Sequence, residues 1–349
     1  MKKILVVGGL PNEKYNCRYG GATVLMKNFK EYLDKTKTAY YFAQTNKYVN
    51  SKTLELKPIK NKIYFMFYFF THIFLCDKVM FNFSDHATVY MFPFLCRCAK
   101  FLHKKVIFRK FGGSFDIYLS NVNEKKRNVV FDALNKCDLI FLETKSGIKY
   151  FERFIVDRCK IHWFPNVRNK SKYKKDETKY NKKLVFMSHI SDEKGVGDLL
   201  NVFQMLPSNF QLDIYGAIKE DKYLNFDWKA KNVNYKGQIS SSEVIKKLTD
   251  YSILLLPSYR EGYPGIILEA MSVGLVVIST SVGGIPEIIE NGENGVLVEP
   301  GDLNALKEAI LSISSQNYKM YSENAYRTFE ERFDADNVNN RIVSCIENL

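Results

Sequence analysis

The residues best placed to do chemistry lie in the segment PSYREGYPGIILEAMSVG, residues 257–274. The apolar run before it, residues 253–256, predicts a strand, and Pro264 with Gly265 is typical of the start of a helix. A helix amino terminus with a small residue leaves backbone N–H groups free to bind an anion. The segment therefore predicts a turn that could hold a nucleotide diphosphate.

Two carboxylates flank this turn. Glu261 lies in the loop and Glu269 about one turn inside the expected helix. Carboxylates repel phosphate, but they accept hydrogen bonds from sugar and ribose hydroxyls. The apolar neighbours of Glu269 argue against an ordinary solvated helix face. We expect Glu261 to contact a donor sugar and Glu269 a ribose diol.

The elements that must position these residues alternate between strand and helix. Short apolar runs at 4–7, 78–83, 105–108 and 138–142 are separated by helical patterns. The alternation stops at the polar segment 169–183 and restarts with runs at 184–187, 211–215, 253–256, 276–279 and 295–298. This order predicts βαβ units and parallel sheets.

The chain of 349 residues is long enough for two cores, and residues 169–183 are the best linker candidate. We therefore predict two doubly wound Rossmann-like domains, residues 1–167 and 168–319, that face a cleft. A terminal helical segment from about residue 320 to 349 is expected to pack back on the first domain. Open α/β sheets bind ligands at the carboxyl ends of their strands.

The motifs in this second half resemble those of glycosyltransferase family 4, whose members have the GT-B fold. The family's Glu-x7-Glu pattern stands at Glu261 and Glu269, and its GG-x-PE turn at residues 283–287. The pattern PS-x-x-EG followed by LEAM-x-x-G stands at 257–274, and NG-x-NG-x-L-V-x-P-x-D at 291–302. The resemblance is close over about 184–310 and looser over the first 165 residues.

The resemblance implies a set of donor-binding residues. Lys194 matches the lysine that holds the donor diphosphate and neutralises the leaving group, so Lys194 and Glu261 are the expected catalytic residues. His189 stands where the family usually has arginine, and Gly20 with Gly21 matches the loop that closes over the phosphates. The motif carries over the remaining donor-site positions Gly262, Tyr263, Pro264, Gly265 and Glu269.

The segment RKFGGSFD, residues 109–116, departs from the family pattern. Many relatives place a histidine before this glycine, whereas here the residue is Phe111. Arg109, Lys110 and Asp116 are nearby candidates for acceptor binding or proton handling. In such relatives the donor phosphate oxygen can take the proton, so catalysis depends mainly on positioning and on stabilising the diphosphate charge.

The implied activity is a retaining, metal-independent sugar transfer from a UDP- or GDP-sugar to a saccharide acceptor. No cofactor is expected. Asp334-Ala335-Asp336 mimics a metal-binding DxD motif, but its place at the start of the terminal helix favours a capping role. The resemblance suggests a lipid-linked acceptor, in the synthesis of a surface polysaccharide or glycoconjugate. It does not separate the donor bases, and the sequence does not define the oligomeric state.

The net charge of +13 is unevenly distributed along the chain. Residues 1–165 carry 29 Lys and Arg against 13 Asp and Glu, whereas the rest carry 22 against 25. A basic half of this kind indicates either a polyanionic partner, such as an anionic membrane leaflet or nucleic acid, or simply a lysine-rich composition. Because no nucleic-acid reading element is visible, nucleic acid is not expected as a partner.

Residues 63–76, IYFMFYFFTHIFLC, are too short to span a membrane. We favour a buried helix, with an aromatic face touching lipid headgroups as the alternative. The seven cysteines are scattered and odd in number, which favours reduced, mostly buried thiols. Together these features predict a cytoplasmic enzyme that could be peripheral on the inner face of the cell membrane.

Other functions fit the same fold. A nucleotide-sugar epimerase or a phosphorylase would share it, but the Glu-x7-Glu pattern with the GG-x-PE turn disfavours both. A non-catalytic subunit of a glycosylation complex is the main alternative, because the expected histidine and arginine are missing at Phe111 and His189.

Overall fold

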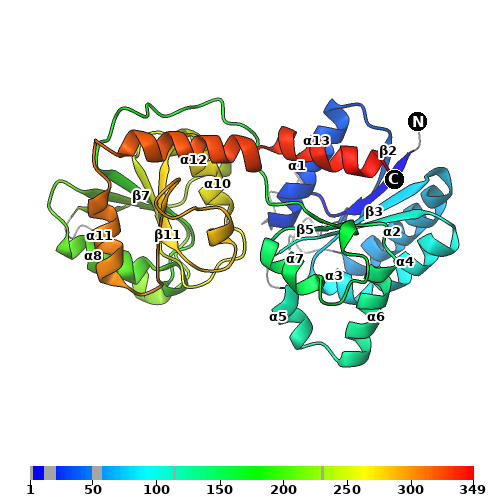
Figure 1. The fold of residues 1–349 in the computed structure, drawn as a ribbon. Coiled ribbons are helices and arrows are strands. Elements are labelled where there is room, and N and C mark those ends of the chain that lie inside the picture. Colours follow the sequence, from blue (N-terminus) through cyan, green and yellow to red (C-terminus); the bar gives the residue numbers. More distant parts are fainter. Residues whose placement is uncertain (1–2, 12–20, 49–56, 113–114, 229–231) are drawn as a thin grey trace. The chain divides into compact units, whose positions relative to one another are not determined.

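The computed structural model describes residues 3–11, 21–48, 57–112, 115–228 and 232–349. The chain forms two compact units. The first comprises residues 1–166 and 338–349, and the second comprises residues 167–337. Each unit is built on a parallel six-stranded sheet with helices around it, so the predicted α/β class with two doubly wound domains is confirmed (Figure 1).

The sheet of the first unit has the strand order β2-β1-β3-β4-β5-β6. Its strands are short apolar runs that lie parallel, as expected for strands covered on both faces. They are β1 (Ile4–Gly8), β2 (Tyr40–Gln44), β3 (Lys78–Phe83), β4 (Lys105–Lys110), β5 (Leu139–Leu142) and β6 (Ile161–Trp163).

Helices cover both faces of this sheet (Figure 1). One apolar core joins the sheet to α2, α3, α4, α6 and α7, whereas α1 and α13 lie on the other face. The helices are α1 (Gly21–Lys35), α2 (Pro58–His72), α3 (Asp85–Tyr90), α4 (Phe92–Phe101), α5 (Phe115–Ser120), α6 (Glu124–Asn135), α7 (Lys145–Phe151) and α13 (Ala335–Glu347). Short 3-10 turns η2 (Ile73–Leu75) and η3 (Arg158–Lys160) follow α2 and α7.

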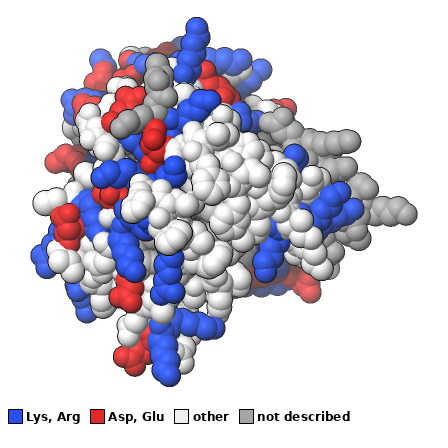
Figure 2. Space-filling view, turned by 90° about the vertical axis from the view of Figure 1, so that its right-hand side faces the viewer, with Lys and Arg blue, Asp and Glu red and all other residues white. Residues whose placement is uncertain are grey.

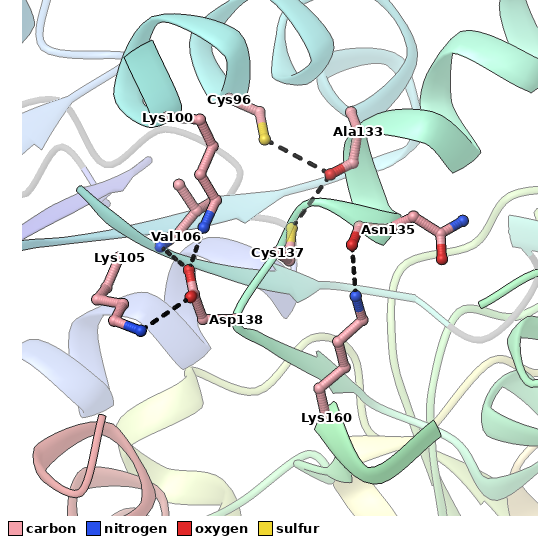
Figure 3. A network of polar contacts seen from close by, with 9 residues as sticks. All are labelled: Cys96, Lys100, Lys105, Val106, Ala133, Asn135, Cys137, Asp138 and Lys160. Carbon is pink, nitrogen blue, oxygen red and sulfur yellow. Dashed lines mark hydrogen bonds and ion pairs between the residues drawn. The ribbon is translucent and has the colours of Figure 1, made fainter. Parts of the chain in front are cut away.

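A polar network ties helices α4 and α6 to strands β4 and β5 (Figure 3). The Asp138 carboxylate accepts hydrogen bonds from Lys100 Nζ, from Lys105 Nζ at 3.3 Å and from the Val106 backbone N–H at 2.7 Å. Burial raises the pKa of Asp138, but these hydrogen bonds lower it by more, so the net shift is downward. The ionised carboxylate therefore stabilises the start of β5.

The sheet of the second unit has the order β12-β11-β10-β7-β8-β9. The first strand of the unit, β7 (Lys183–Met187), lies beside the fourth, β10 (Ile253–Leu256), and the chain winds outward from this pair in both directions. Open α/β sheets bind ligands at such a switch point. The other strands are β8 (Gln211–Tyr215), β9 (Val233–Tyr235), β11 (Val276–Thr280) and β12 (Val296–Val298).

In this unit α8 packs against α11, and α10 packs against α9 and α12. The helices are α8 (Val196–Met205), α9 (Ser241–Leu248), α10 (Gly265–Met271), α11 (Leu303–Ser312) and α12 (Tyr318–Arg332). Three 3-10 turns, η4 (Asp192–Lys194), η5 (Asp221–Tyr223) and η6 (Ile285–Glu287), complete it.

The polar segment 169–183 is predicted to be a linker between the units. In the structure it belongs to the second unit and packs on it. The Lys175 N–H donates to the Val273 carbonyl at 3.0 Å, and the Tyr180 ring lies 5.3 Å from that of Tyr318. The expectation of a free linker missed these contacts because two tyrosines and backbone hydrogen bonds anchor the segment despite its polarity.

The terminal segment that belongs to the first unit is shorter than expected, since it starts at Val338 instead of about residue 320. Helix α12 stays with the second unit because its inner side is buried there, and Ser322 Oγ donates to the Gly274 carbonyl. The expected capping role of Asp334 is confirmed, since its Oδ1 accepts the Asn337 N–H at 3.0 Å.

Two further expectations concern helices. The predicted helix over 86–102 is interrupted at Met91, between α3 and α4, and Pro93 stands in the first turn of α4. Within the described ranges, no helix is long and apolar enough to cross a membrane. The six described cysteines all carry free thiols, and three of them are buried.

Candidate donor-binding site

The predicted donor residues of the second unit gather at its switch point. The chain leaving β7 carries His189 and Lys194, and the chain leaving the neighbouring strand β10 carries Glu261. Both strands are parallel, so both loops emerge at the carboxyl edge of the sheet. Lys194 and Glu261, which are 67 positions apart in the sequence, are thereby placed in direct contact.

Lys194 and Glu261 form an ion pair, with 2.8 Å between Nζ and Oε1. The same Nζ donates to the Arg260 carbonyl at 3.1 Å, and Ser258 Oγ donates to the same Oε1 at 2.9 Å. The side chains of Lys194 and Glu261 are 16% and 11% exposed. Since Glu261 Oε2 makes no hydrogen bond within the described ranges, it is available to accept one from a hydroxyl.

The loop after β7 is held against the loop after β10. The Tyr259 N–H donates to the Glu193 carbonyl at 2.8 Å. Gly195 has φ +75°, and a Cβ there would lie 2.1 Å from the Pro257 carbonyl oxygen. Only glycine allows this close approach, so the Lys194-Gly195 pair fixes where the ammonium group sits.

The start of α10 is braced by the glycine turn that follows β11. The Gly284 N–H donates to the Gly262 carbonyl at 2.7 Å. Tyr263 is buried, and its ring meets that of Phe333 edge-on at 6.2 Å. Pro264 precedes the first helical residue, Gly265, as the sequence predicts. The GG-x-PE turn therefore holds the loop after β10 in place, and its last three residues form η6.

Glu269 contacts a residue that sequence reasoning did not select. Arg168 Nε donates to Glu269 Oε1 at 2.7 Å, and these side chains are 17% and 22% exposed. The Arg168 backbone is fixed by a bridge to the segment after α12, through hydrogen bonds to the Phe333 carbonyl and from the Ala335 N–H. The signal that could have identified it is an arginine two residues after Asn166, where the chain passes from the first unit to the second.

The Arg168 guanidinium also covers the start of α10. A Cβ at Gly265 would lie 1.6 Å from Arg168 Nη2, so any side chain at 265 would displace the arginine. A positive charge thus stands where the sequence predicts a diphosphate, beside the carboxylate expected to contact the ribose. The site then comprises two cation–carboxylate pairs, Lys194–Glu261 and Arg168–Glu269.

His189 lies in the exposed turn between β7 and η4. Its neighbours are fixed, because the Ser188 N–H donates to the Tyr215 carbonyl and the Ile190 N–H to the Ala217 carbonyl. The imidazole therefore belongs to the same edge of the sheet as Lys194, and its role as a diphosphate ligand stays a prediction.

The predicted site residues of the first unit do not gather in one place as those of the second unit do, and they differ in burial. Gly20 lies outside the described residues, and Gly21 is the exposed first residue of α1. Arg109, near the end of β4, is buried with its guanidinium carbon 3.4 Å from the Phe164 ring centre and 4.6 Å from that of Phe111. Burial lowers the pKa of Arg109 to about 9, against an opposing effect of Glu143.

Lys110 and Asp116 differ from Arg109 in their surroundings. Lys110 is buried and pairs with Asp85 at 2.5 Å, while its ammonium group also donates to the Phe111 carbonyl. Burial lowers the pKa of Lys110, and the pairing with Asp85 opposes this shift. Asp116 is exposed in the first turn of α5. Lys110 is therefore held by structural contacts, whereas Asp116 faces solvent.

A pocket of about 270 Å³ lies at the switch point of the first sheet. It is lined by the ends of β1, β2 and β3 through Gly9, Thr45 and Asn82, and by Phe111 after β4. Asn82 is buried, and its Oδ1 has no hydrogen-bond partner among the described residues. Arg109, its register partner on β4, has a buried Nη1 that is also without a partner in the described part of the chain. The pocket therefore offers a buried acceptor to a ligand hydroxyl, with an unsatisfied donor nearby.

The described part of the chain contains no group of three or more His, Cys, Asp or Glu side chains arranged to hold a metal ion.

Comparison with known proteins finds a family profile that matches the second unit. Residues 167–328 match the sequence profile described as Glycosyl transferases group 1. A capsular polysaccharide biosynthesis glycosyltransferase of Staphylococcus aureus is 26% identical over 188 residues, 50% of this chain and 45% of that protein. An uncharacterized glycosyltransferase of Methanocaldococcus jannaschii is 33% identical over 153 residues, 43% of each chain. The chain thus spans slightly less than half of these relatives.

Solved structures match over the whole chain. Anabaena HepE in complex with UDP superposes with a TM-score of 0.72 at 16% identity, and all of both chains is covered. Sucrose-phosphate synthase from Thermosynechococcus elongatus gives 0.73 at 15% identity, covering 100% of this chain and 99% of that one. At such low identity these likenesses establish the fold, which is that of the GT-B glycosyltransferases.

Proposed function

We propose that this protein is a retaining glycosyltransferase that moves a sugar from a UDP- or GDP-sugar to a saccharide acceptor. The observation that carries the proposal is the Lys194–Glu261 ion pair at the switch point of the second sheet, beside the Arg168–Glu269 pair. These carboxylates occupy the two positions of the Glu-x7-Glu pattern of glycosyltransferase family 4, which the chain resembles. The profile match over 167–328 covers both.

In the proposed reaction an acceptor hydroxyl attacks the anomeric carbon from the face that the diphosphate leaves. The new glycosidic C–O bond forms as the bond to the phosphate oxygen breaks, and a phosphate oxygen takes the hydroxyl proton. Lys194 stabilises the negative charge that develops on the diphosphate, which is the largest electrostatic demand of the step. Glu261 Oε2 orients the donor sugar through its hydroxyls.

Arg168 supplies the guanidinium that the sequence lacks at position 189. Its guanidinium pairs with Glu269 and covers the amino end of α10. On donor binding it keeps the Glu269 carboxylate aligned for the ribose diol and faces the diphosphate. The site needs no bound metal in this scheme, because two cations serve the leaving group.

The acceptor is proposed to bind the first unit, at the pocket lined by Asn82 and Phe111. The apolar walls suit a sugar face, and Asn82 Oδ1 accepts a hydrogen bond from an acceptor hydroxyl. Relatives named for capsular polysaccharide, colanic acid and amylovoran biosynthesis support a lipid-linked saccharide in the synthesis of a surface polymer. Such acceptors place the enzyme peripherally on the cytoplasmic face of a membrane, with its basic half toward anionic lipid.

The test is release of nucleoside diphosphate from UDP- and GDP-sugars, with and without a lipid extract of the source cells. The purified chain should release it only with extract and equally in EDTA, and NMR should find the donor's anomeric configuration in the product. Glu261→Gln should release at least about 100-fold less. Extract-dependent release that is unchanged in Glu261→Gln would contradict the assignment. No release with any donor would favour a non-catalytic subunit, and free epimerised sugar nucleotide an epimerase.

A further inference from the structure

Helix α2 presents apolar side chains on two different sides. On one side Phe65 and Phe69 are buried in the core of the first unit. On the other side Ile59, Ile63 and Phe67, spaced four residues apart, are 75%, 66% and 70% exposed. The following turn η2 adds Phe74 and Leu75 at 64% and 57%. The expectation of a simply buried helix is therefore wrong for this exposed face.

An exposed row of large apolar side chains has a free-energy cost in water that a folded monomer ordinarily avoids. The row cannot turn inward, because the buried stripe anchors α2 against β2 and the core. Nor can the helix leave the fold to cross a membrane, because 15 residues extend only about 22 Å against a hydrocarbon core of about 30 Å. This exposed face of α2 is therefore suited to contact an apolar surface that lies parallel to the helix axis.

Positive charge borders this apolar row. Residues 57–76 contain Lys57, Lys60 and Lys62 and no Asp or Glu. At the amino end of α2, Lys60 Nζ lies 4.3 Å from the centre of the Tyr48 ring and Lys47 Nζ lies 4.1 Å from that of Tyr64. Figure 2 views the side of the first unit where Figure 1 draws α2 and α4, and it shows a broad uncharged area bordered by lysine and arginine.

The same end of α2 is hollowed. A cavity of about 620 Å³ opens between Tyr48, Ile59, Ile63, Tyr64 and Phe67, with Lys57 and Lys60 on its rim. An apolar hollow with a tyrosine and lysine rim matches the boundary between acyl chains and anionic headgroups.

We propose that the exposed face of α2 and η2 is a membrane-docking surface that inserts into the interface of an anionic lipid bilayer. The helix lies in the plane of the membrane, with Ile59, Ile63, Phe67, Phe74 and Leu75 between the acyl chains. Lys57, Lys60 and Lys62 contact lipid phosphates. This goes beyond the proposed transfer reaction, because it concerns a surface of the first unit that holds no proposed catalytic residue.

Charge separates this partner from a second copy of the chain. In a symmetric dimer through α2, the same patch meets itself, so the lysines of both copies would share one interface and repel one another. No Asp or Glu between 57 and 76 could offset that repulsion. An anionic leaflet instead offers both an apolar interior and a negative surface, and it attracts each nearby lysine.

Flotation of the full chain with phosphatidylcholine vesicles, with and without phosphatidylglycerol, tests the proposal without donor or acceptor. Binding should require phosphatidylglycerol and weaken with salt. The Ile63→Ser, Phe67→Ser double variant should bind about tenfold less or weaker. The matched control Ile117→Ser, Val156→Ser removes apolar residues that are 61% and 91% exposed on other elements, and it should bind as the parent does.

Insertion has its own signature. Tryptophan emission of a Phe67→Trp variant should shift to the blue on phosphatidylglycerol vesicles, whereas Ile117→Trp should not respond. Equal binding by the double variant and the parent, or no binding by the parent, would overturn the proposal. A parent that sediments as a dimer and a double variant that sediments as a monomer, neither binding lipid, would instead make the face an interface between copies. Because nucleotide-sugar chemistry is not read out, failure here leaves the proposed transfer intact.

Discussion

At the scale of single residues, the candidate site is organised by one lysine. The Lys194 ammonium bonds both to Glu261 Oε1 and to the Arg260 carbonyl, and its position is set by the tight Gly195 turn. A fixed cation costs no reorganisation when charge builds up on a leaving diphosphate. The same pair, together with the hydrogen bond from Ser258 Oγ, fixes the orientation of the Glu261 carboxylate.

Lys194→Ala should lower kcat by about 100- to 1000-fold, because a preorganised charge on the leaving group is lost. Lys194→Arg should recover part of this activity. Lys246→Ala, an exposed lysine on α9, is the matched control and should be neutral. Steady-state kinetics of nucleoside diphosphate release measure all three, and a kcat for Lys194→Ala within about threefold of the parent would refute the role.

Arg168→Ala should raise KM for the donor about tenfold or more, because Glu269 loses its partner and the start of α10 loses its positive charge. Arg168→Lys should restore less than half of the affinity, since an ammonium lacks the guanidinium fork. Donor titrations by calorimetry give the affinities directly. An unchanged donor affinity in Arg168→Ala would show that the arginine serves only to hold the chain.

The sequence predicts the position of Lys194, Glu261, Pro264 and Glu269, because each lies in a motif with fixed spacing from a strand. It does not predict Arg168 or the role of Ser258. Arg168 reaches the site only through the bridge to the segment after α12, which is a contact between residues more than 160 positions apart. Single-sequence patterns carry no information on such a pairing.

At the scale of elements, the short apolar strands are predictable because a strand buried on both faces reads as a continuous apolar run. The surroundings of α2 cannot be predicted in the same way. Its sequence is apolar nearly all round, and periodicity cannot tell a doubly buried helix from one with an exposed apolar side. For the segment 169–183 the error is the opposite one. Its polar composition predicts an unpacked linker, whereas Tyr180 packs on Tyr318.

Asp138→Asn should reduce the free energy of unfolding at neutral pH by about 1–2 kcal/mol, because the carboxylate joins Lys100, Lys105 and the Val106 N–H (Figure 3). The pKa of Asp138 in the folded chain is lowered from its ordinary 3.8. Its contribution is therefore present above about pH 4 and is lost as the pH falls through the folded-state pKa.

Denaturant unfolding of parent and variant at several pH values checks this prediction. The difference between them should shrink as the pH falls below 4. Asp132→Asn, an exposed carboxylate on α6, is the control and should change stability by no more than about 0.5 kcal/mol. If the difference in the free energy of unfolding stayed constant with pH, Asp138 would stabilise the fold through its shape and not through its charge.

At the scale of the whole molecule, the two units carry different features. The second unit carries the family profile and both cation–carboxylate pairs, and the first carries most of the positive charge and the exposed face of α2. The motifs of the second unit have fixed spacing, so they can be recognised in one sequence. The first unit has no such motif, so Arg109, Lys110 and Asp116 are predicted only as neighbours within the segment 109–116.

The central claim is that a nucleotide sugar binds at Lys194, Arg168, Glu261 and Glu269. The most direct test is a thermal-shift titration of the full chain with UDP- and GDP-sugars, repeated on Glu269→Ala and Lys194→Ala, with Lys246→Ala as control. One nucleotide family should raise Tm by about 2–5 °C in the parent and the control, and by much less in both site variants. An equal rise in all four proteins would contradict the account, because the donor would then bind elsewhere on the chain.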